Sequence, residues 1–211
     1  MDHETGRLLA VLDELGLRDS TFVLFTSDNG PETLRRYRGA ERSYGSPGPL
    51  RGMKLHLYEG GIRVPGIVRW PGRVPAGAES REAMCGTDVL PTLCGIAGVG
   101  VPGDRAIDGE DVAAVLEGRT AARKSPIYWQ YDRAPGAPKV AMRQGGWKLL
   151  ADADLGGFEL YNLQEDPGET TDLSGREAVR VREMAGVMRD IHARVSQDRP
   201  DGPPAETRPV R

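Results

Sequence analysis

The sequence TFVLFTSDNGP (residues 21–31) is an apolar, β-branched run that ends at an adjacent carboxylate and carboxamide and then turns at Gly-Pro. The run predicts a buried strand. In an open α/β sheet, ligands bind beyond the carboxyl ends of the strands, so Asp28 and Asn29 are expected where chemistry is done. Hard cations such as calcium and magnesium prefer these oxygen ligands. Asn-Gly after a hydrophobic run is also typical of a hairpin turn, and on this segment alone the two interpretations stand even.

An amphipathic helix is expected just before this strand. Leucines recur at helical spacing over residues 3–16, and Gly16 stands where a C-terminal cap belongs. A helix, a short connection and a strand form the unit that builds parallel sheets, which indicates an α/β fold. After Pro31 the sequence is rich in Arg, Gly, Ser and Pro through about residue 50. This composition predicts a long surface loop beside Asp28 and Asn29.

Later in the chain the pattern changes from helical to alternating. The expected elements are a strand at 62–70, helices at 87–97 and near 112–117, short strands at 127–131, 140–143, 147–150 and 158–161, and a helix at 177–195. Pro65 is expected early in its strand or at an edge. Gln144-Gly145-Gly146 is the clearest hairpin, and the last helix would cover one face of the small antiparallel sheet.

These patterns divide the chain into three parts. Residues 1–123 are expected to form α/β structure, and residues 124–196 a small antiparallel sheet with a packed C-terminal helix. The tail at 197–211 is Pro-rich and polar, so it is expected to be disordered.

Composition excludes several functional classes. The 211 residues carry a net charge of −3 with scattered basic residues, which argues against nucleic acid or an anionic membrane as a partner. No apolar stretch approaches the roughly 20 residues of a membrane span, and the first residues lack the order of a signal peptide. Cys85 and Cys94 match no zinc-site spacing and are expected to be buried free thiols.

A second informative segment is LRGMKLHLYEGGIRVP (residues 50–65), which places Lys54 before a glycine pair and an expected strand. A lysine ammonium can neutralise a tetrahedral anion held against a metal. A lone lysine is more often a solvated surface charge. Its position after the loop that follows Asp28 and Asn29 favours a site.

Together these segments resemble sulfatases of the arylsulfatase type, within the alkaline-phosphatase-like superfamily. FTSDNG (25–30) resembles the second metal-ligand segment of that family, and residues 54–65 resemble its Lys-then-Glu-Gly-Gly-x-Arg-Val-Pro segment. DVLPTL (88–93) and ELYNL followed by DPGE (159–169) resemble its structural stretches, in the same order. The resemblance implies the C-terminal part of an alkaline-phosphatase-like α/β sulfatase domain, followed by the small sheet and helix.

The resemblance also implies roles for individual residues. Asp28 and Asn29 would be protein ligands of a divalent cation, calcium or alternatively magnesium, and Lys54 would be a catalytic residue that contacts the substrate sulfate. Metal and ammonium together would withdraw charge from the sulfate oxygens as the ester bond breaks. Asn29 favours a sulfatase over zinc- and manganese-dependent phosphoesterases, whose Asp-His pair suits those metals better.

Three further residues of the second segment are expected to have supporting roles. Glu59 and Arg63 would organise the Gly-Gly turn rather than touch substrate. His56, where the family has a small or polar residue, would be packed or solvent-facing.

Part of the family's catalytic machinery has no counterpart here. The formylglycine nucleophile is made in a Cys-x-Pro-x-Arg context, which neither Cys85 nor Cys94 has, and no Asp pair precedes Asp28. We therefore expect a C-terminal fragment that is inactive alone and lacks the N-terminal part of its own domain. Two alternatives are a non-catalytic remnant that binds an anion or calcium, and a fragment of a related phosphoesterase.

The complete protein is expected to hydrolyse an aryl or carbohydrate sulfate ester. Loops at 32–49 and 132–139 would contribute to the choice of substrate. Export to the periplasm or beyond is expected for that complete protein only.

Overall fold

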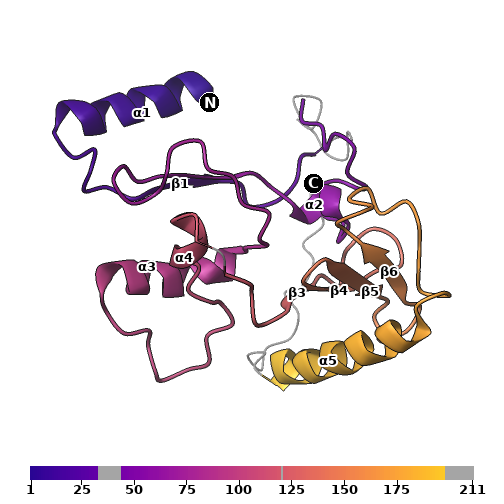
Figure 1. Ribbon diagram of the computed structural model, residues 1–211. Coiled ribbons are helices and arrows are strands. Elements are labelled where there is room, and N and C mark those ends of the chain that lie inside the picture. Colours follow the sequence, from indigo (N-terminus) through magenta and orange to yellow (C-terminus); the bar gives the residue numbers. More distant parts are fainter. Residues whose placement is uncertain (33–43, 120, 198–211) are drawn as a thin grey trace, which may run out of the picture.

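The computed structural model of the chain describes residues 1–32, 44–119 and 121–197. In chain order its elements are α1 (Asp2–Glu14), β1 (Val23–Thr26), α2 (Glu59–Ile62), β2 (Gly66–Arg69), the 3-10 helix η2 (Gly86–Asp88), α3 (Val89–Ala97), α4 (Ala113–Leu116), β3 (Ile127–Gln130), β4 (Val140–Gln144), β5 (Trp147–Ala151), β6 (Glu159–Asn162) and α5 (Ala178–Gln197). They include a two-stranded sheet, β1-β2, and a four-stranded sheet ordered β3-β4-β5-β6 (Figure 1).

The four-stranded sheet is antiparallel throughout, as the alternating pattern predicts. Its central hairpin joins β4 to β5 at Gly145, whose positive φ of 58° suits a residue without a Cβ. Successive strand residues face opposite sides, so each side of the sheet has its own core.

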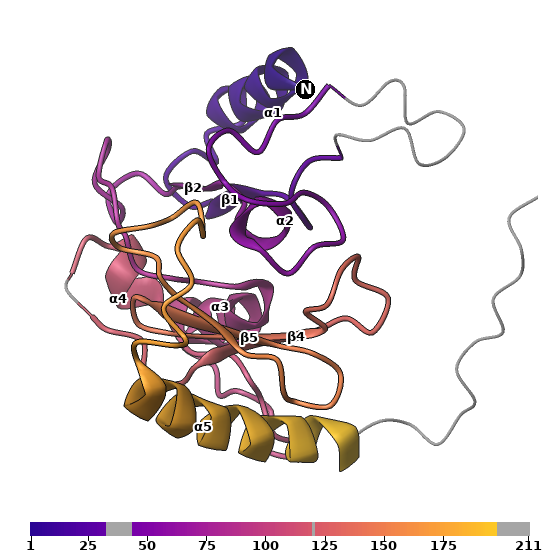
Figure 2. The same ribbon diagram turned by 90° about the vertical axis from the view of Figure 1, so that its right-hand side faces the viewer.

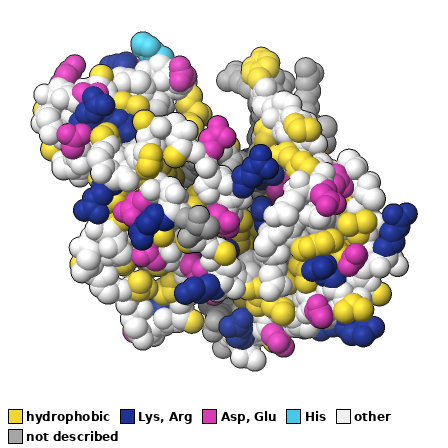
Figure 3. Space-filling model, in the orientation of Figure 1, with side chains coloured by type: hydrophobic (Ala, Val, Ile, Leu, Met, Phe, Trp, Pro, Cys, Tyr) yellow, Lys and Arg dark blue, Asp and Glu magenta, His cyan; other side chains and the backbone are white. Residues whose placement is uncertain are grey.

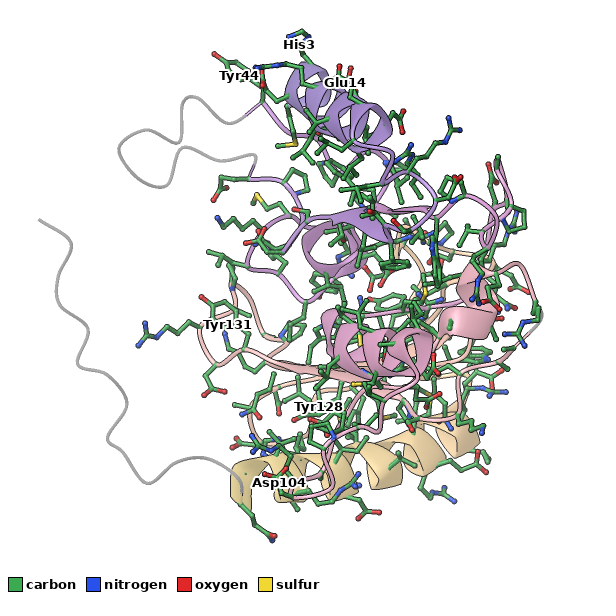
Figure 4. All side chains as sticks on the ribbon, turned by 90° about the vertical axis from the view of Figure 1, so that its left-hand side faces the viewer. His3, Glu14, Tyr44, Asp104, Tyr128 and Tyr131 are labelled. Carbon is green, nitrogen blue, oxygen red and sulfur yellow. The ribbon has the colours of Figure 1, made fainter. Side chains whose placement is uncertain are left out.

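The first core lies between the sheet and α5, as predicted. Met184, Ala185 and Met188 of α5 are buried against strand residues that include Met142 and Leu160. The helix runs along one face of the sheet (Figure 2). Tyr128 of β3 reaches toward the same helix, where its hydroxyl lies 2.8 Å from Nδ1 of His192 (Figure 4).

The second core lies on the other face of the sheet and positions the candidate site. Ala141, Leu150 and Tyr161 are buried there against Leu57 and Tyr58, which immediately precede α2. The four-stranded sheet is therefore covered by α5 on one side and by the Glu-Gly-Gly segment on the other.

The two-stranded sheet corrects one prediction. Strand β1 pairs antiparallel with β2, with Val23 opposite Arg69 and Thr26 opposite Gly66, a pairing on which the helix-strand unit made no statement. None of the residues of β1 is buried, which corrects the buried strand expected from its apolar run. Helix α1 likewise has no buried residue.

Two further boundaries differ from the sequence-based expectation. The second strand begins at Gly66 rather than at 62, because α2 takes up Ile62 and Pro65 lacks the N–H that a strand pairing needs. The tail was expected to start at 197, yet Gln197 closes α5; residues 198–211, and residues 33–43 of the predicted loop, lie outside the described part of the chain.

The predicted burial of the two cysteines is wrong. Cys85 and Cys94 are free thiols, but both are partly exposed rather than buried. Cys85 lies at the N-terminal end of η2, and Cys94 lies on the short helix α3.

Candidate functional site

The turn after β1 contacts the lysine segment directly. The amide of Gly30 donates a hydrogen bond to the carbonyl of Gly61 (2.8 Å), and the amide of Lys54 donates to the carbonyl of Pro31 (3.0 Å). The two segments that the sequence singled out are therefore joined through the backbone on both sides of the turn. This contact brings the backbones of Asn29, Gly30 and Lys54 into one region.

Three glycines make this close backbone approach possible. A Cβ atom on Gly30 would overlap the carbonyl of Gly60, and one on Gly61 would overlap the carbonyl of His56. Gly60 is enclosed by the carbonyls of Arg51 and Gly52. The loop before α2 thus wraps around the glycine pair, and only residues without side chains fit at the contact.

The predicted ligands lie at the open side of this contact. Asp28 is exposed, whereas Asn29 and Lys54 are partly buried. The hydroxyl of Ser27 donates to Oδ1 of Asp28 (3.4 Å) and to the carbonyl of Asn29 (3.0 Å), which shapes the end of the strand.

The donor types of Asp28 and Asn29 fit a hard divalent cation, because one supplies a carboxylate and the other an amide oxygen. Two protein ligands are few for such a cation. Within the described residues no group of three or more His, Cys, Asp and Glu side chains is placed to hold a metal ion. A cation held by these two residues would keep several waters.

A cavity of about 490 Å³ opens beside Asp28. Its lining includes Ser27, Asp28 and mainly apolar side chains from β1, α3 and β3, but neither Asn29 nor Lys54. The lining carries mixed charge, with three arginines (Arg63, Arg81 and Arg143) and, besides Asp28, three acidic residues (Glu59, Glu82 and Asp88). The cavity therefore reaches the candidate site at Asp28 but does not extend to Asn29 or Lys54.

The supporting residues behave largely as predicted. Glu59 is buried at the start of α2, and its carboxylate lies 3.7 Å from Arg63. His56 is partly buried, with Nδ1 3.2 Å from the carbonyl of Met53. Both glutamate and arginine flank the glycine pair and are well placed to organise it.

Sequence reasoning missed a buried ion cluster formed by Glu59, Lys148 and Glu169. The ammonium of Lys148, which is fully buried on β5, lies 3.0 Å from Oε1 of Glu59 and 2.8 Å from Oε1 of Glu169. The amide of Glu59 donates to Oε2 of Glu169 (2.6 Å). Burial raises the pKa of Glu169, although Lys148 opposes the shift.

A second polar cluster lies beside it and consists of Arg51, Tyr58, Glu159 and Tyr161. The Glu159 carboxylate accepts hydrogen bonds from the hydroxyls of Tyr58 (2.9 Å) and Tyr161 (2.6 Å). The guanidinium of Arg51 stacks 3.8 Å from the centre of the Tyr58 ring and donates to the Tyr161 hydroxyl (2.8 Å). Burial and the Glu159 carboxylate raise the pKa of both tyrosines.

The surface shows no concentration of basic charge on the face in Figure 3, where Lys and Arg side chains are interspersed with Asp and Glu. Among the helices in the described part of the chain, none combines the length and apolar character that a bilayer span needs.

Comparison with known proteins identifies the class. A family described as "N-sulphoglucosamine sulphohydrolase, C-terminal" matches residues 53–200, and the family described as "Sulfatase" matches residues 1–99. The fold is that of the alkaline-phosphatase-like α/β domain of sulfatases. The chain belongs to the sulfatase family.

Curated relatives agree with this assignment. Human arylsulfatase A is 32% identical over 214 residues, a match that covers 90% of this chain and 41% of the human protein. Rat steryl-sulfatase is 42% identical over 134 residues, which covers 64% of this chain and 23% of the relative. The chain thus spans less than half the length of the relatives it matches.

Solved structures show the same relationship. The crystal structure of Ps i-CgsB in complex with k-i-k-neocarrahexaose has a TM-score of 0.75 at 26% identity, over 93% of this chain and 41% of that chain. PsFucS1 sulfatase from Pseudoalteromonas sp. has a TM-score of 0.74 at 28% identity, over 96% of this chain and 42% of that chain.

Proposed function

We propose that this chain is the C-terminal part of a sulfatase catalytic domain and that the complete protein hydrolyses an aryl or carbohydrate sulfate ester. The observation that carries the proposal is the double backbone contact, Gly30 to Gly61 and Lys54 to Pro31, which joins the two motif segments. Relatives that match the chain include proteins named for steryl and N-acetylgalactosamine-6-sulfate chemistry.

In this proposal Asp28 and Asn29 hold a divalent cation, calcium or alternatively magnesium. The cation supplies positive charge to the sulfate oxygens. Lys54 contributes its ammonium to the same anion, and the partly buried position of the side chain reduces competition from water. Ser27 supports the ligand pair by its hydrogen bonds to Asp28 and Asn29.

Formylglycine, the nucleophile that the family resemblance implies, does not fit either cysteine of this chain. Neither Cys85 nor Cys94 stands in a Cys-x-Pro-x-Arg context. The thiol of Cys85 lies 2.9 Å from the hydroxyl of Thr87 at the start of η2. No reaction step is assigned to either thiol, and we expect the chain by itself to bind sulfate weakly and to show no appreciable turnover.

Amide chemical shifts provide the test. Calcium should shift the amide signals of Asp28 and Asn29, and inorganic sulfate that of Lys54, each with low affinity. Lys54→Ala should weaken sulfate binding about tenfold, the effect of one lost charge-assisted hydrogen bond. The control Lys124→Ala, at an exposed lysine, should leave binding unchanged.

Two results would count against the proposal. Equal weakening by Lys54→Ala and Lys124→Ala would remove Lys54 from the site. Turnover of 4-nitrophenyl sulfate by this chain, lost in Lys54→Ala, would show that the chain is catalytically competent and that the expected inactivity is wrong.

A further inference from the structure

The four-stranded sheet is linked to the candidate site through a buried lysine of β5, Lys148, which lies in none of the motif segments. We propose that Lys148 is a positioning residue: its buried ammonium, by holding Glu59 and Glu169 together, fixes α2 and through it the Asp28-Asn29 turn and Lys54. The inference rests on the proposed function only where it treats Asp28, Asn29 and Lys54 as a site for a cation and sulfate. The contacts that connect Lys148 to these residues do not depend on that assignment.

The first step runs from the sheet to α2. Lys148 lies on β5 with 0% of its side chain exposed, and its two carboxylate partners are 2% and 0% exposed. Glu59 belongs to α2, whereas Glu169 lies beyond β6, so the ammonium joins two segments far apart in the chain. An ammonium without water needs such partners, and each carboxylate needs the ammonium, so the three groups fix one another's positions.

The second step runs from Glu59 to the glycine pair. The Glu59 amide is hydrogen-bonded to the Glu169 carboxylate, so both the backbone and the side chain of Glu59 are held. Gly60 and Gly61 follow directly in α2. A displacement of Glu59 therefore displaces the glycine pair as well.

The third step runs from the glycine pair to the predicted ligands. The Gly61 carbonyl accepts the Gly30 amide, and no side chain cushions the contact between Gly30 and Gly60. Backbone packed against backbone leaves little room for independent movement. The position of α2 thus sets the position of Asn29 and of the Lys54 amide at Pro31.

A second set of contacts, made by Arg51, also ties this region to the four-stranded sheet. Arg51 donates to the Tyr161 hydroxyl on β6 and to the carbonyl of Glu169, while its own carbonyl accepts the Gly60 amide (2.7 Å). The loop that carries Lys54 is therefore tied to the same sheet before it reaches α2. Both ends of the segment from residue 51 to residue 61 depend on the sheet.

The test compares a charge-balanced double variant with a matched control in this chain. Lys148→Met/Glu169→Gln removes one positive and one negative group and leaves Glu59 facing Arg63. Arg123→Met breaks another buried ion pair, in which Arg123 lies 2.6 Å from Asp88, away from the glycine contact. Amide hydrogen exchange is measured at Gly30 and Lys54, and at Met188 in the α5 core as the reference for global unfolding.

We expect Gly30 and Lys54 to exchange about tenfold faster, relative to Met188, in the double variant and at unchanged relative rates in Arg123→Met. Equal relative rates in the double variant and the wild type, or the same acceleration in Arg123→Met, would overturn the inference. Should the double variant not fold, Glu169→Gln alone is judged by the same two criteria. Inorganic sulfate and calcium are then titrated into the wild type: absence of binding refutes the proposed function, whereas the exchange rates still decide the role of Lys148.

Discussion

Gly30 is the residue at which the two motif segments touch. Its amide is hydrogen-bonded to Gly61, and its α-carbon faces the Gly60 carbonyl without room for a methyl group. The residue is not in the left-handed region of backbone conformation, so space rather than torsion demands a glycine here.

Gly30→Ala should therefore destabilise the fold by roughly 1–3 kcal/mol, because the added methyl must push α2 away from the turn. Urea denaturation followed by tryptophan fluorescence measures the change. Gly66→Ala is the matched control, since its added Cβ would meet no atom within 4 Å, and it should change stability by no more than about 0.5 kcal/mol. Equal stabilities for the two variants would show that the contact is looser than the structure has it.

The residues in and around the site differ in how easily they could be identified from the sequence. Asp28, Asn29 and Lys54 stand in recognisable segments, and their roles as ligands and sulfate contact remain predictions. Lys148 gives no such signal, because WKLLA looks like a strand with its charged residue toward water. It is buried instead because the Glu-Gly-Gly segment covers that face of the sheet, a long-range contact that periodicity does not encode.

Among the helices and strands, local sequence patterns predicted which elements form better than they predicted how the strands pair. Helix α5 and all four strands β3 to β6 lie where the alternation and the helical period indicate. The helix before β1 indicated an α/β unit but did not name the strand's partner, and β2 lies antiparallel beside it. A strand's sequence states which residues face a core but not which neighbour it joins.

Strand β6 forms one edge of the four-stranded sheet, and a following segment covers that edge. The Leu160 amide donates to Oδ1 of Asp172 (3.0 Å), and the Leu160 carbonyl accepts from the Leu173 amide (2.8 Å). Asp172 also accepts hydrogen bonds from Ser174. Polar groups that would otherwise be unpaired at the edge are satisfied by these contacts.

The Asp172 carboxylate makes this edge pH-dependent. Burial alone would raise its pKa, but the N–H groups of Leu160 and Ser174 outweigh burial and hold the pKa below its ordinary value of 3.8. A carboxylate whose pKa falls on folding stabilises the fold above its unfolded pKa, and the contribution is lost as the pH falls through the folded pKa. Asp172→Asn should thus cost about 1 kcal/mol near neutral pH and progressively less below 3.8.

Urea titrations of wild type and Asp172→Asn between about pH 7 and about pH 3 measure this difference in unfolding free energy. Asp190→Asn, at an exposed position on α5, is the control and should change stability by no more than about 0.5 kcal/mol. A pH-independent cost for Asp172→Asn would mean that the carboxylate charge contributes nothing to the edge.

For the molecule as a whole, the core is unevenly distributed. Both faces of the four-stranded sheet are covered, by α5 and by the segment around α2. At the other end, α1 has no buried residue, and a 2.5 Å ion pair joins its Asp13 to Arg69 of β2. Figure 4 shows His3 and Glu14, at the two ends of this helix, far from α5.

Helix α1 carries an apolar stripe that should drive self-association of the chain. Leu8 and Val11 of α1 and Leu15, the residue that caps its C-terminal end, follow helical spacing and are 64%, 49% and 65% exposed. Burying a leucine side chain is worth about 1.5–3 kcal/mol, so Leu8→Gln/Leu15→Gln should weaken association at least about tenfold. Glutamine keeps the helix propensity close to that of leucine, which separates the effect from unfolding of α1.

Sedimentation velocity over a concentration series measures the association. The control Val99→Gln/Val179→Gln changes two side chains that are 58% and 64% exposed but lie outside the stripe, so it removes comparable apolar surface without touching α1. If the control weakened association as much as the stripe variant, exposed apolar area in general would be responsible. If neither variant altered the concentration dependence, the stripe would not be a contact surface. Weakening by the stripe variant alone is the expected result, because the three exposed apolar residues of the stripe form a longer exposed row than the pair Leu90 and Leu93 on α3.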